Sequence, residues 1–290
     1  MQTEPFVDGL CYPECPRWHD GAVWLSDQHA GVVVRVAMSD SGGSGTVEEV
    51  AALPTEPAGL GWAPDGTLRV VSMHDHRLLS LDLAAGADGR FELVADLSAF
   101  HPGLSNELLV DPAGRAYVGN IGFDYYGGDD PRPTVVVLVD PDGTVRVAAA
   151  DLLVPNGMVL TPDGRTLVVA ESFAHRLTAF TVAADGSLAD RRVFADLGDD
   201  IPDGICLDAE GGVWYAAIGR HEVVRVVSGG QVTDRVSTGD REAVACVLGG
   251  PDRRRLFVCT TLHLDPEHSV PARSGRLEVV DVAVPGGCLP

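Results

Sequence analysis

Four oxygen-bearing side chains occupy equivalent places in a repeated unit of the sequence, although the chain separates them widely. Each unit has an apolar run, a tight turn and a second apolar run. One residue of the turn, glycine in five units and Arg253 in the sixth, is the reference position, called the ruler, from which the other positions are counted. Glu14 lies seven residues before the ruler, whereas Asn106, Asn156 and Asp203 lie eight residues before it. Carboxylate and carboxamide oxygens are hard donors that suit Ca²⁺ or Mg²⁺ better than soft metals do. The pattern therefore indicates one divalent-cation site, provided that the fold brings these residues together.

The elements that must position them are short strands that recur about every 45 residues. Successive rulers are 45, 48, 50, 47 and 42 residues apart, at Gly21, Gly66, Gly114, Gly164, Gly211 and Arg253. A period in the forties with several strands per unit is typical of a β-propeller blade. We therefore expect an all-β, six-bladed β-propeller that uses residues 1–290 as a single domain.

The sixth unit ends one strand short. Because an unpaired sheet edge is a liability, we expect residues 5–10 to pair there as the missing outer strand and close the ring. Apolar residues nowhere recur with helical spacing over three turns, so no helix is expected.

The first strand of each blade lines the channel of a propeller, so the starts of these strands should converge at one mouth. The other two equivalent positions are Ala58 and Ala245, which leave room for a ligand. Taken singly, Asn156 and Asp203 are ordinary turn residues because each precedes glycine. Their shared register with Glu14 and Asn106 favours the cation site.

Loops between the second and third strands should open on the same face and form the rim of a pocket. Two longer inserts lie there, one with Tyr126 and one with His263 and His268. Glu171, Ser172 and Phe173 should lie near the same rim. The candidate substrate-contacting residues are Met73, His74, Asn106, Asn120, Phe123 and Tyr125.

Composition excludes several partner classes. The formal net charge of -21 and the pI of about 4.6 disfavour nucleic acids and anionic membrane surfaces. The N-terminal segment lacks the basic start and apolar run of a signal peptide, and no apolar run is long enough for a membrane span, so we expect a cytoplasmic protein. Cys206, Cys246 and Cys259 fall in apolar runs and are expected to be buried, reduced thiols.

Several motifs together resemble the family of senescence marker protein (regucalcin) and gluconolactonase. They are ECPRW, SNELLVDPAGRAYVGN, VPNGMVLTPDGRTLVVAES, IPDGICLDAEGGVW and ACVLGGPDRRRLFVCT. The resemblance implies a six-bladed propeller with one cation held by Glu14, Asn156 and Asp203, and with Asn106 near the substrate. Sugar lactonases of this family commonly carry Arg where this chain has Leu104, and Asp where it has Glu107.

The resemblance implies a metal-dependent hydrolase of a lactone or similar cyclic ester, with a small molecule as its partner. Ca²⁺ is the expected ion, with Mg²⁺, Mn²⁺ and Zn²⁺ as alternatives. The proton acceptor is either Asp203 or, if metal binding makes that carboxylate a weak base, solvent acting on a metal-bound water. Two other readings remain open: phosphotriester hydrolysis or ring-opening or isomerisation of a metabolite at the same site, and a non-enzymatic calcium-binding propeller. No GxSxG motif supports a serine hydrolase.

Overall fold

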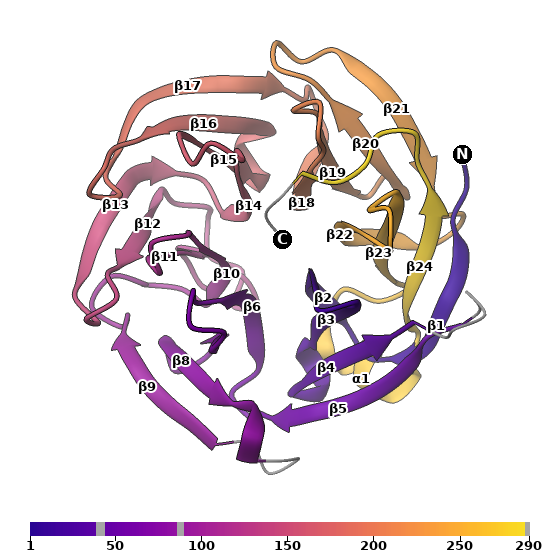
Figure 1. The fold of residues 1–290 in the computed structure, drawn as a ribbon, viewed down its shortest axis with the longest axis horizontal. Helices are drawn as coiled ribbons and strands as arrows, with labels where there is room; N and C mark the ends of the chain where they lie inside the picture. Colours follow the sequence, from indigo (N-terminus) through magenta and orange to yellow (C-terminus); the bar gives the residue numbers. More distant parts are fainter. Residues whose placement is uncertain (39–43, 86–89, 288–290) are drawn as a thin grey trace.

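The computed structural model describes residues 1–38, 44–85 and 90–287. In these ranges the strands form six four-stranded antiparallel sheets around a central axis (Figure 1), so the predicted all-β propeller is confirmed. The first blade contains β2 (Pro13–His19), β3 (Ala22–Asp27), β4 (Val32–Ala37) and β5 (Thr46–Ala52). The second contains β6 (Pro57–Trp62), β7 (Leu68–Ser72), β8 (Arg77–Asp82) and β9 (Arg90–Asp96). The third contains β10 (Ser105–Val110), β11 (Ala116–Asn120), β12 (Thr134–Val139) and β13 (Val145–Leu152).

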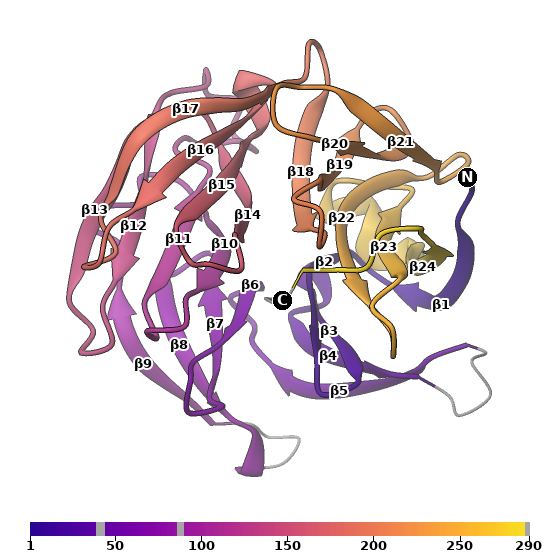
Figure 2. The same cartoon turned by 45° about the horizontal axis from the view of Figure 1, so that its top comes forward.

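The remaining blades follow the same order from the axis outward. The fourth contains β14 (Pro155–Leu160), β15 (Thr166–Glu171), β16 (Arg176–Val182) and β17 (Leu188–Asp196). The fifth contains β18 (Ile201–Leu207), β19 (Val213–Ile218), β20 (Glu222–Val226) and β21 (Val232–Ser237). The sixth contains β22 (Glu242–Gly249), β23 (Arg255–Thr261), β24 (Gly275–Asp281) and β1 (Glu4–Leu10). Figure 2 shows the innermost strands standing around the channel.

The hydrophobic core lies between blades. One cluster joins Trp24 and Val33 of the first blade to Leu60 and Leu79 of the second, and comparable clusters fill the other junctions in the described chain. Outer strands such as β5 are largely exposed, whereas β3 is buried along its length. Each sheet therefore gains stability by stacking on its neighbours, as expected for a propeller.

The N-terminal strand closes the ring as predicted. β1 pairs antiparallel with β24, from Glu4 opposite Val279 to Leu10 opposite Gly275. Phe6 is buried in the cluster between the sixth and first blades, where its ring lies 5.4 Å from that of Phe257.

The expectation of no helix is wrong for one insert. α1 (Pro266–Ala272) lies between β23 and β24, and the described residues also contain 3₁₀ turns at η1 (Gln28–Ala30), η2 (Leu83–Ala85) and η3 (Ser172–Ala174). The Asp265 side chain caps α1 by accepting a hydrogen bond from His268 N, and Pro266 begins the helix. Seven residues are too few for a three-turn apolar pattern. In the described ranges, no helix is long and apolar enough to cross a membrane.

The cysteine prediction is confirmed, because Cys206, Cys246 and Cys259 are buried and free.

Candidate functional site

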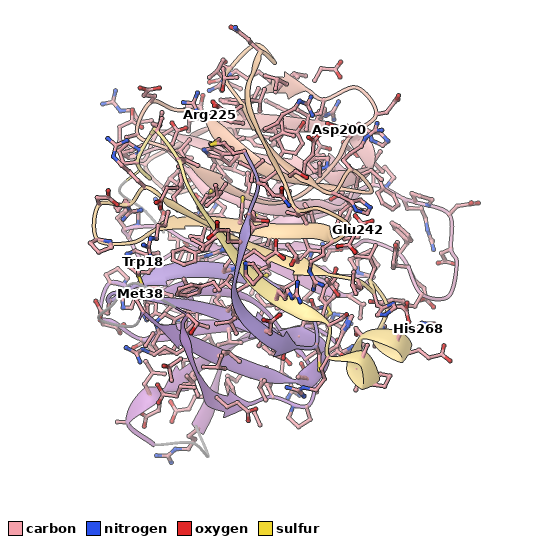
Figure 3. All side chains as sticks on the ribbon, turned by 90° about the vertical axis from the view of Figure 1, so that its right-hand side faces the viewer. Trp18, Met38, Asp200, Arg225, Glu242 and His268 are labelled. Carbon is pink, nitrogen blue, oxygen red and sulfur yellow. The ribbon has the colours of Figure 1, made fainter. Side chains whose placement is uncertain are left out.

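A cavity of about 250 Å³ opens at one mouth of the channel. Figure 3 shows the ring from its edge, with Asp200, Glu242 and His268 on one face and Trp18 and Met38 on the other. Asp200 directly precedes β18 and Glu242 begins β22, so the inner strands start on the face that carries α1. The cavity is lined by Tyr12, Glu14, Gln28, Met73, Leu104, Asn106, Ile121, Tyr125, Tyr126, Val154, Asn156, Ser172, Phe173, Ile201, Asp203, Ile218 and Leu264.

A break in strand register explains how the inner strands present their polar side chains. In β10, β14 and β18, two consecutive residues have no partner in the second strand of the blade. The first residue of each unpaired segment is Asn106, Asn156 or Asp203, respectively. In β2 the skipped residues are Cys15 and Pro16, so Glu14 sits just before the break. Because bulges re-aim side chains, the repeat places these groups in one cavity, and Glu14 reaches it from one position earlier.

Small residues behind the cavity allow the inner strands to approach closely. A Cβ atom on Gly157 would lie 2.5 Å from Ile205 N, and one on Gly204 would lie 2.4 Å from Ala245 Cβ. A side chain at either position would therefore collide with the neighbouring blade, and glycine avoids this collision.

Two carboxylates face the cavity with little exposure to solvent. Glu14 and Asp203 are each 8% exposed. Burial and the negative charge of Asp203 raise the pKa of Glu14 well above its usual range. Burial and the charge of Glu107 raise the pKa of Asp203 to about 7, although a hydrogen bond from Asn156 Nδ2 to Asp203 Oδ1 opposes the shift. Without a cation, the ionised forms of both carboxyl groups are therefore destabilised.

Glu107 belongs to an ion pair next to the cavity, in the channel. Its Oε2 lies 2.7 Å from Arg17 Nη2, and the two side chains are 3% and 11% exposed. Arg17 also donates hydrogen bonds to the carbonyl oxygens of Pro16, at 2.9 Å, and Leu108, at 2.6 Å. The long Glu107 side chain thus has a cationic partner from another blade.

The donor set fits a hard divalent cation. Glu14, Glu107 and Asp203 contribute three negative charges when ionised and Arg17 contributes one positive charge, which leaves a local charge of −2 that a dication would neutralise. In the described ranges, no three His, Cys, Asp or Glu side chains form a metal-binding group. The cavity instead combines two carboxylates with the carboxamides of Asn106 and Asn156, which are also ligands that Ca²⁺ accepts.

Tyr12 is a candidate functional residue that no pattern in the sequence marks. It lines the cavity, and its pKa is raised well above the usual value by burial and by the charges of Glu14 and Asp203. The ring stacks on His29 with centroids 4.3 Å apart, and Tyr12 N donates to Asp27 Oδ1 at 2.7 Å. A neutral phenol is therefore held close to both carboxylates.

The candidate substrate-contacting residues fall into two groups. Met73, Asn106 and Tyr125 line the cavity. Asn120 is fully buried and binds Val135 O and Thr134 Oγ1, and Phe123 packs behind Phe173 with ring centroids 5.9 Å apart. His74 is half exposed and lies 3.2 Å from Glu56. Asn120, Phe123 and His74 therefore do not line the cavity.

Of the other predicted rim residues, Tyr126, Ser172 and Phe173 line the cavity, whereas Glu171 supports it from behind. Glu171 is fully buried, accepts a hydrogen bond from Leu153 N at 3.1 Å, and pairs with Arg176 and Arg191. It therefore fixes the loop before β14. From the insert with His263 and His268, Leu264 lines the cavity.

The apolar lining had no sequence signal of its own. Ile121, Val154, Ile201 and Ile218 stand at strand ends or in loops, where an isolated aliphatic residue is indistinguishable from core. Leu104 stands out in the sequence only as a departure from the family pattern.

The chain is thus a six-bladed β-propeller with a cavity at one mouth of its channel, lined by two carboxylates, two carboxamides and apolar side chains. Residues 12–262 match the family described as the SMP-30/Gluconolactonase/LRE-like region, and the chain belongs to this family. This finding confirms the resemblance seen in the motifs.

Relatives with assigned names include two lactonases. The chain is 28% identical over 259 residues to 6-deoxy-6-sulfogluconolactonase of Pseudomonas putida, and this alignment covers 86% of this chain and 82% of that protein. It is 30% identical over 160 residues to pentonolactonase XacC of Haloferax volcanii, and this alignment covers 53% of this chain and 52% of that protein. The chain thus aligns with only about half the length of the second relative.

Solved structures share the fold. A luciferin-regenerating enzyme superposes with a TM-score of 0.81 at 18% identity, covering 99% of this chain and 97% of that one. A calcium-binding regucalcin from Agrobacterium tumefaciens superposes with a TM-score of 0.77 at 24% identity, covering 100% and 98%.

Proposed function

We propose that this protein is a divalent-cation-dependent hydrolase that opens a lactone or similar cyclic ester. The observation that carries the proposal is that Glu14, Asn106, Asn156 and Asp203, from four blades, line a single cavity. Two lactonases among the relatives support the reaction class. The calcium-binding regucalcin with this fold supports Ca²⁺ as the first ion to test.

Glu14, Asn156 and Asp203 would hold the cation, with Asn106 beside them. When bound, it would supply Lewis-acid polarisation of the ester carbonyl and a lowered pKa for a coordinated water. Asn156 Nδ2 holds one oxygen of Asp203 by a hydrogen bond, which orients the carboxylate that is our candidate proton acceptor. The Tyr12 hydroxyl remains protonated at neutral pH, so it can donate a hydrogen bond to a substrate oxygen.

The deciding experiment combines calorimetric titration with Ca²⁺ and an acid-release assay on a panel of lactones. Glu14→Gln and Asp203→Asn should weaken Ca²⁺ binding at least tenfold and lower kcat/KM at least a hundredfold. Chelation should remove activity, and added Ca²⁺ should restore it.

Asp163→Asn is a matched control, because Asp163 stands in the same Pro-Asp-Gly sequence as Asp203 but caps an exposed hairpin turn. It should leave both readouts unchanged. Full activity in chelator-treated protein would contradict the cation dependence. Tight Ca²⁺ binding without turnover of any ester would instead favour a non-enzymatic calcium-binding protein.

A further inference from the structure

We propose that the site takes a small, uncharged lactone or cyclic ester with an aromatic or aliphatic substituent, in preference to a polyhydroxylated or anionic one. This inference rests on the proposed function and specifies its substrate class. It follows from how polar and apolar groups are distributed over the cavity.

The wall of the cavity is apolar. Tyr125 and Tyr126 are about half exposed at its edge, where their ring centroids lie 5.4 Å apart, and Phe173 lies 6.4 Å from Tyr125. The aliphatic part of the lining comprises Met73, Leu104, Ile121, Val154, Ile201, Ile218 and Leu264. A ring or alkyl substituent placed here would lose its contact with water and stack on aromatic faces.

Two polar groups in the lining already have partners within the protein. Ser172 Oγ donates to Pro202 O at 2.7 Å, and Gln28 Nε2 contacts Met73 Sδ at 2.8 Å. Of the seven other polar side chains in the lining, Glu14, Asn156 and Asp203 are assigned to the cation with Asn106 beside them, and the three tyrosines, Tyr12, Tyr125 and Tyr126, each offer a single hydroxyl group. The hydroxyl groups of a sugar lactone would therefore find few partners along the wall, and each unpaired hydroxyl weakens binding.

The described lining residues offer no cationic side chain to an anionic substituent. Among the described residues that line the cavity there is no Lys, Arg or His, while Glu14 and Asp203 supply two carboxylates. A sulfonate or phosphate on the substrate would meet no cationic partner along the wall. The volume of about 250 Å³ lies below the range of roughly 300–1,000 Å³ typical of drug-sized ligands, which limits the substituent to about one ring.

The apolar wall is held in place by specific contacts. Val154 precedes a proline, has a φ of 52° and is 6% exposed. A β-branched residue is strained in this left-handed region and persists there only when its surroundings fix it. Here Ser172 N donates to Val154 O at 3.1 Å, and Glu171 binds the preceding Leu153 N.

The test compares γ-phenyl-γ-butyrolactone with glucono-1,5-lactone on the Ca²⁺-saturated protein. We expect kcat/KM to favour the phenyl lactone at least tenfold. Leu104→Asn, a change of similar size, should lower kcat/KM for the phenyl lactone about tenfold and leave the sugar lactone unchanged or faster.

The matched control is Leu93→Asn on β9, where Leu93 is 62% exposed and outside the cavity. It should leave the ratio of the two lactones unchanged, and unchanged unfolding temperatures should establish that both variants fold. A wild-type protein that prefers the sugar lactone would overturn the substrate class while leaving the proposed hydrolysis intact.

A second readout does not depend on turnover. The lactam analogues 5-phenyl-2-pyrrolidinone and gluconolactam resist hydrolysis, and only the first should raise the unfolding temperature. If neither lactone is hydrolysed but the phenyl lactam stabilises the protein, hydrolysis is refuted and the ligand class is supported. If the sugar lactam alone stabilises the protein, the ligand class is refuted.

Discussion

The buried pair of Arg17 and Glu107 offers a sharp test of the channel as the structure describes it. Replacing Arg17 with Met keeps an apolar stem but leaves the Glu107 carboxylate, 3% exposed, without its cation. Removing one partner of a buried ion pair typically costs about 3–5 kcal/mol. Unfolding entropy is about 2.1 cal/mol/K per residue, or about 0.6 kcal/mol/K for 290 residues, so the expected fall in unfolding temperature is about 5–8 °C.

The second arm removes both charges. Arg17→Met combined with Glu107→Leu should recover most of the lost stability, because an apolar pair of similar volume avoids the uncompensated charge. The control is Arg35→Met, since Arg35 pairs with Glu48 at 3.3 Å on the surface and such exposed pairs contribute about 0–1 kcal/mol.

Scanning calorimetry in the presence of a chelator measures all four proteins without a contribution from bound cation. An Arg17→Met protein that unfolds within about 1 °C of the Arg35→Met control would refute the reasoning. A double variant as unstable as the Arg17→Met single variant would show that packing rather than charge is responsible.

Three further predictions concern other parts of the ring. Phe6→Ala should cost about 3–5 kcal/mol in denaturant unfolding because it empties the junction that β1 closes, and a loss below 1 kcal/mol would contradict that role. Gly157→Ala should cost about 1–3 kcal/mol and weaken Ca²⁺ binding, since its methyl group would press on Ile205 N; unchanged binding by calorimetry would argue against close strand contact as a requirement of the site. Burial lowers the pKa of His101 to about 3 from 6.5, so between these pH values the unfolded chain binds a proton that the folded protein excludes. Stability should therefore fall on acidification by up to about 1.4 kcal/mol per pH unit from this group, and a His101→Gln variant with an unaltered pH profile would exclude the histidine as the cause.

The repeat was sufficient to predict the blades because its spacing records strand geometry directly. Turn residues and apolar runs recur wherever a sheet must pair and stack, so the ring and its closure by residues 5–10 followed from the sequence. The sequence does not predict α1, because a seven-residue helix depends on its cap at Asp265 rather than on an apolar periodicity.

The site was only partly readable from the sequence. The equivalent positions of Asn106, Asn156 and Asp203 are visible because each begins a bulge at the same place in its inner strand. Glu14 is offset by one residue and lies just before the bulge in β2, which skips Cys15 and Pro16. Tyr12 lies in the segment before β2, where no repeat position marks it. Its place beside the carboxylates depends on contacts with Asp27 and His29.

The pairing of β1 with β24 also constrains how the molecule assembles. Thr3 Oγ1 and Glu278 Oε2 meet at 2.5 Å although 275 positions separate them in the sequence. Contacts between such distant segments carry a large loop-closure entropy, so they are expected to form late in folding. During synthesis on a ribosome, residues 4–10 must wait for β24 to emerge, with Phe6 and Val7 exposed in the meantime. The nascent protein therefore presents an open sheet edge and an apolar segment until the sixth blade is complete, and this interval is when it is most vulnerable to aggregation.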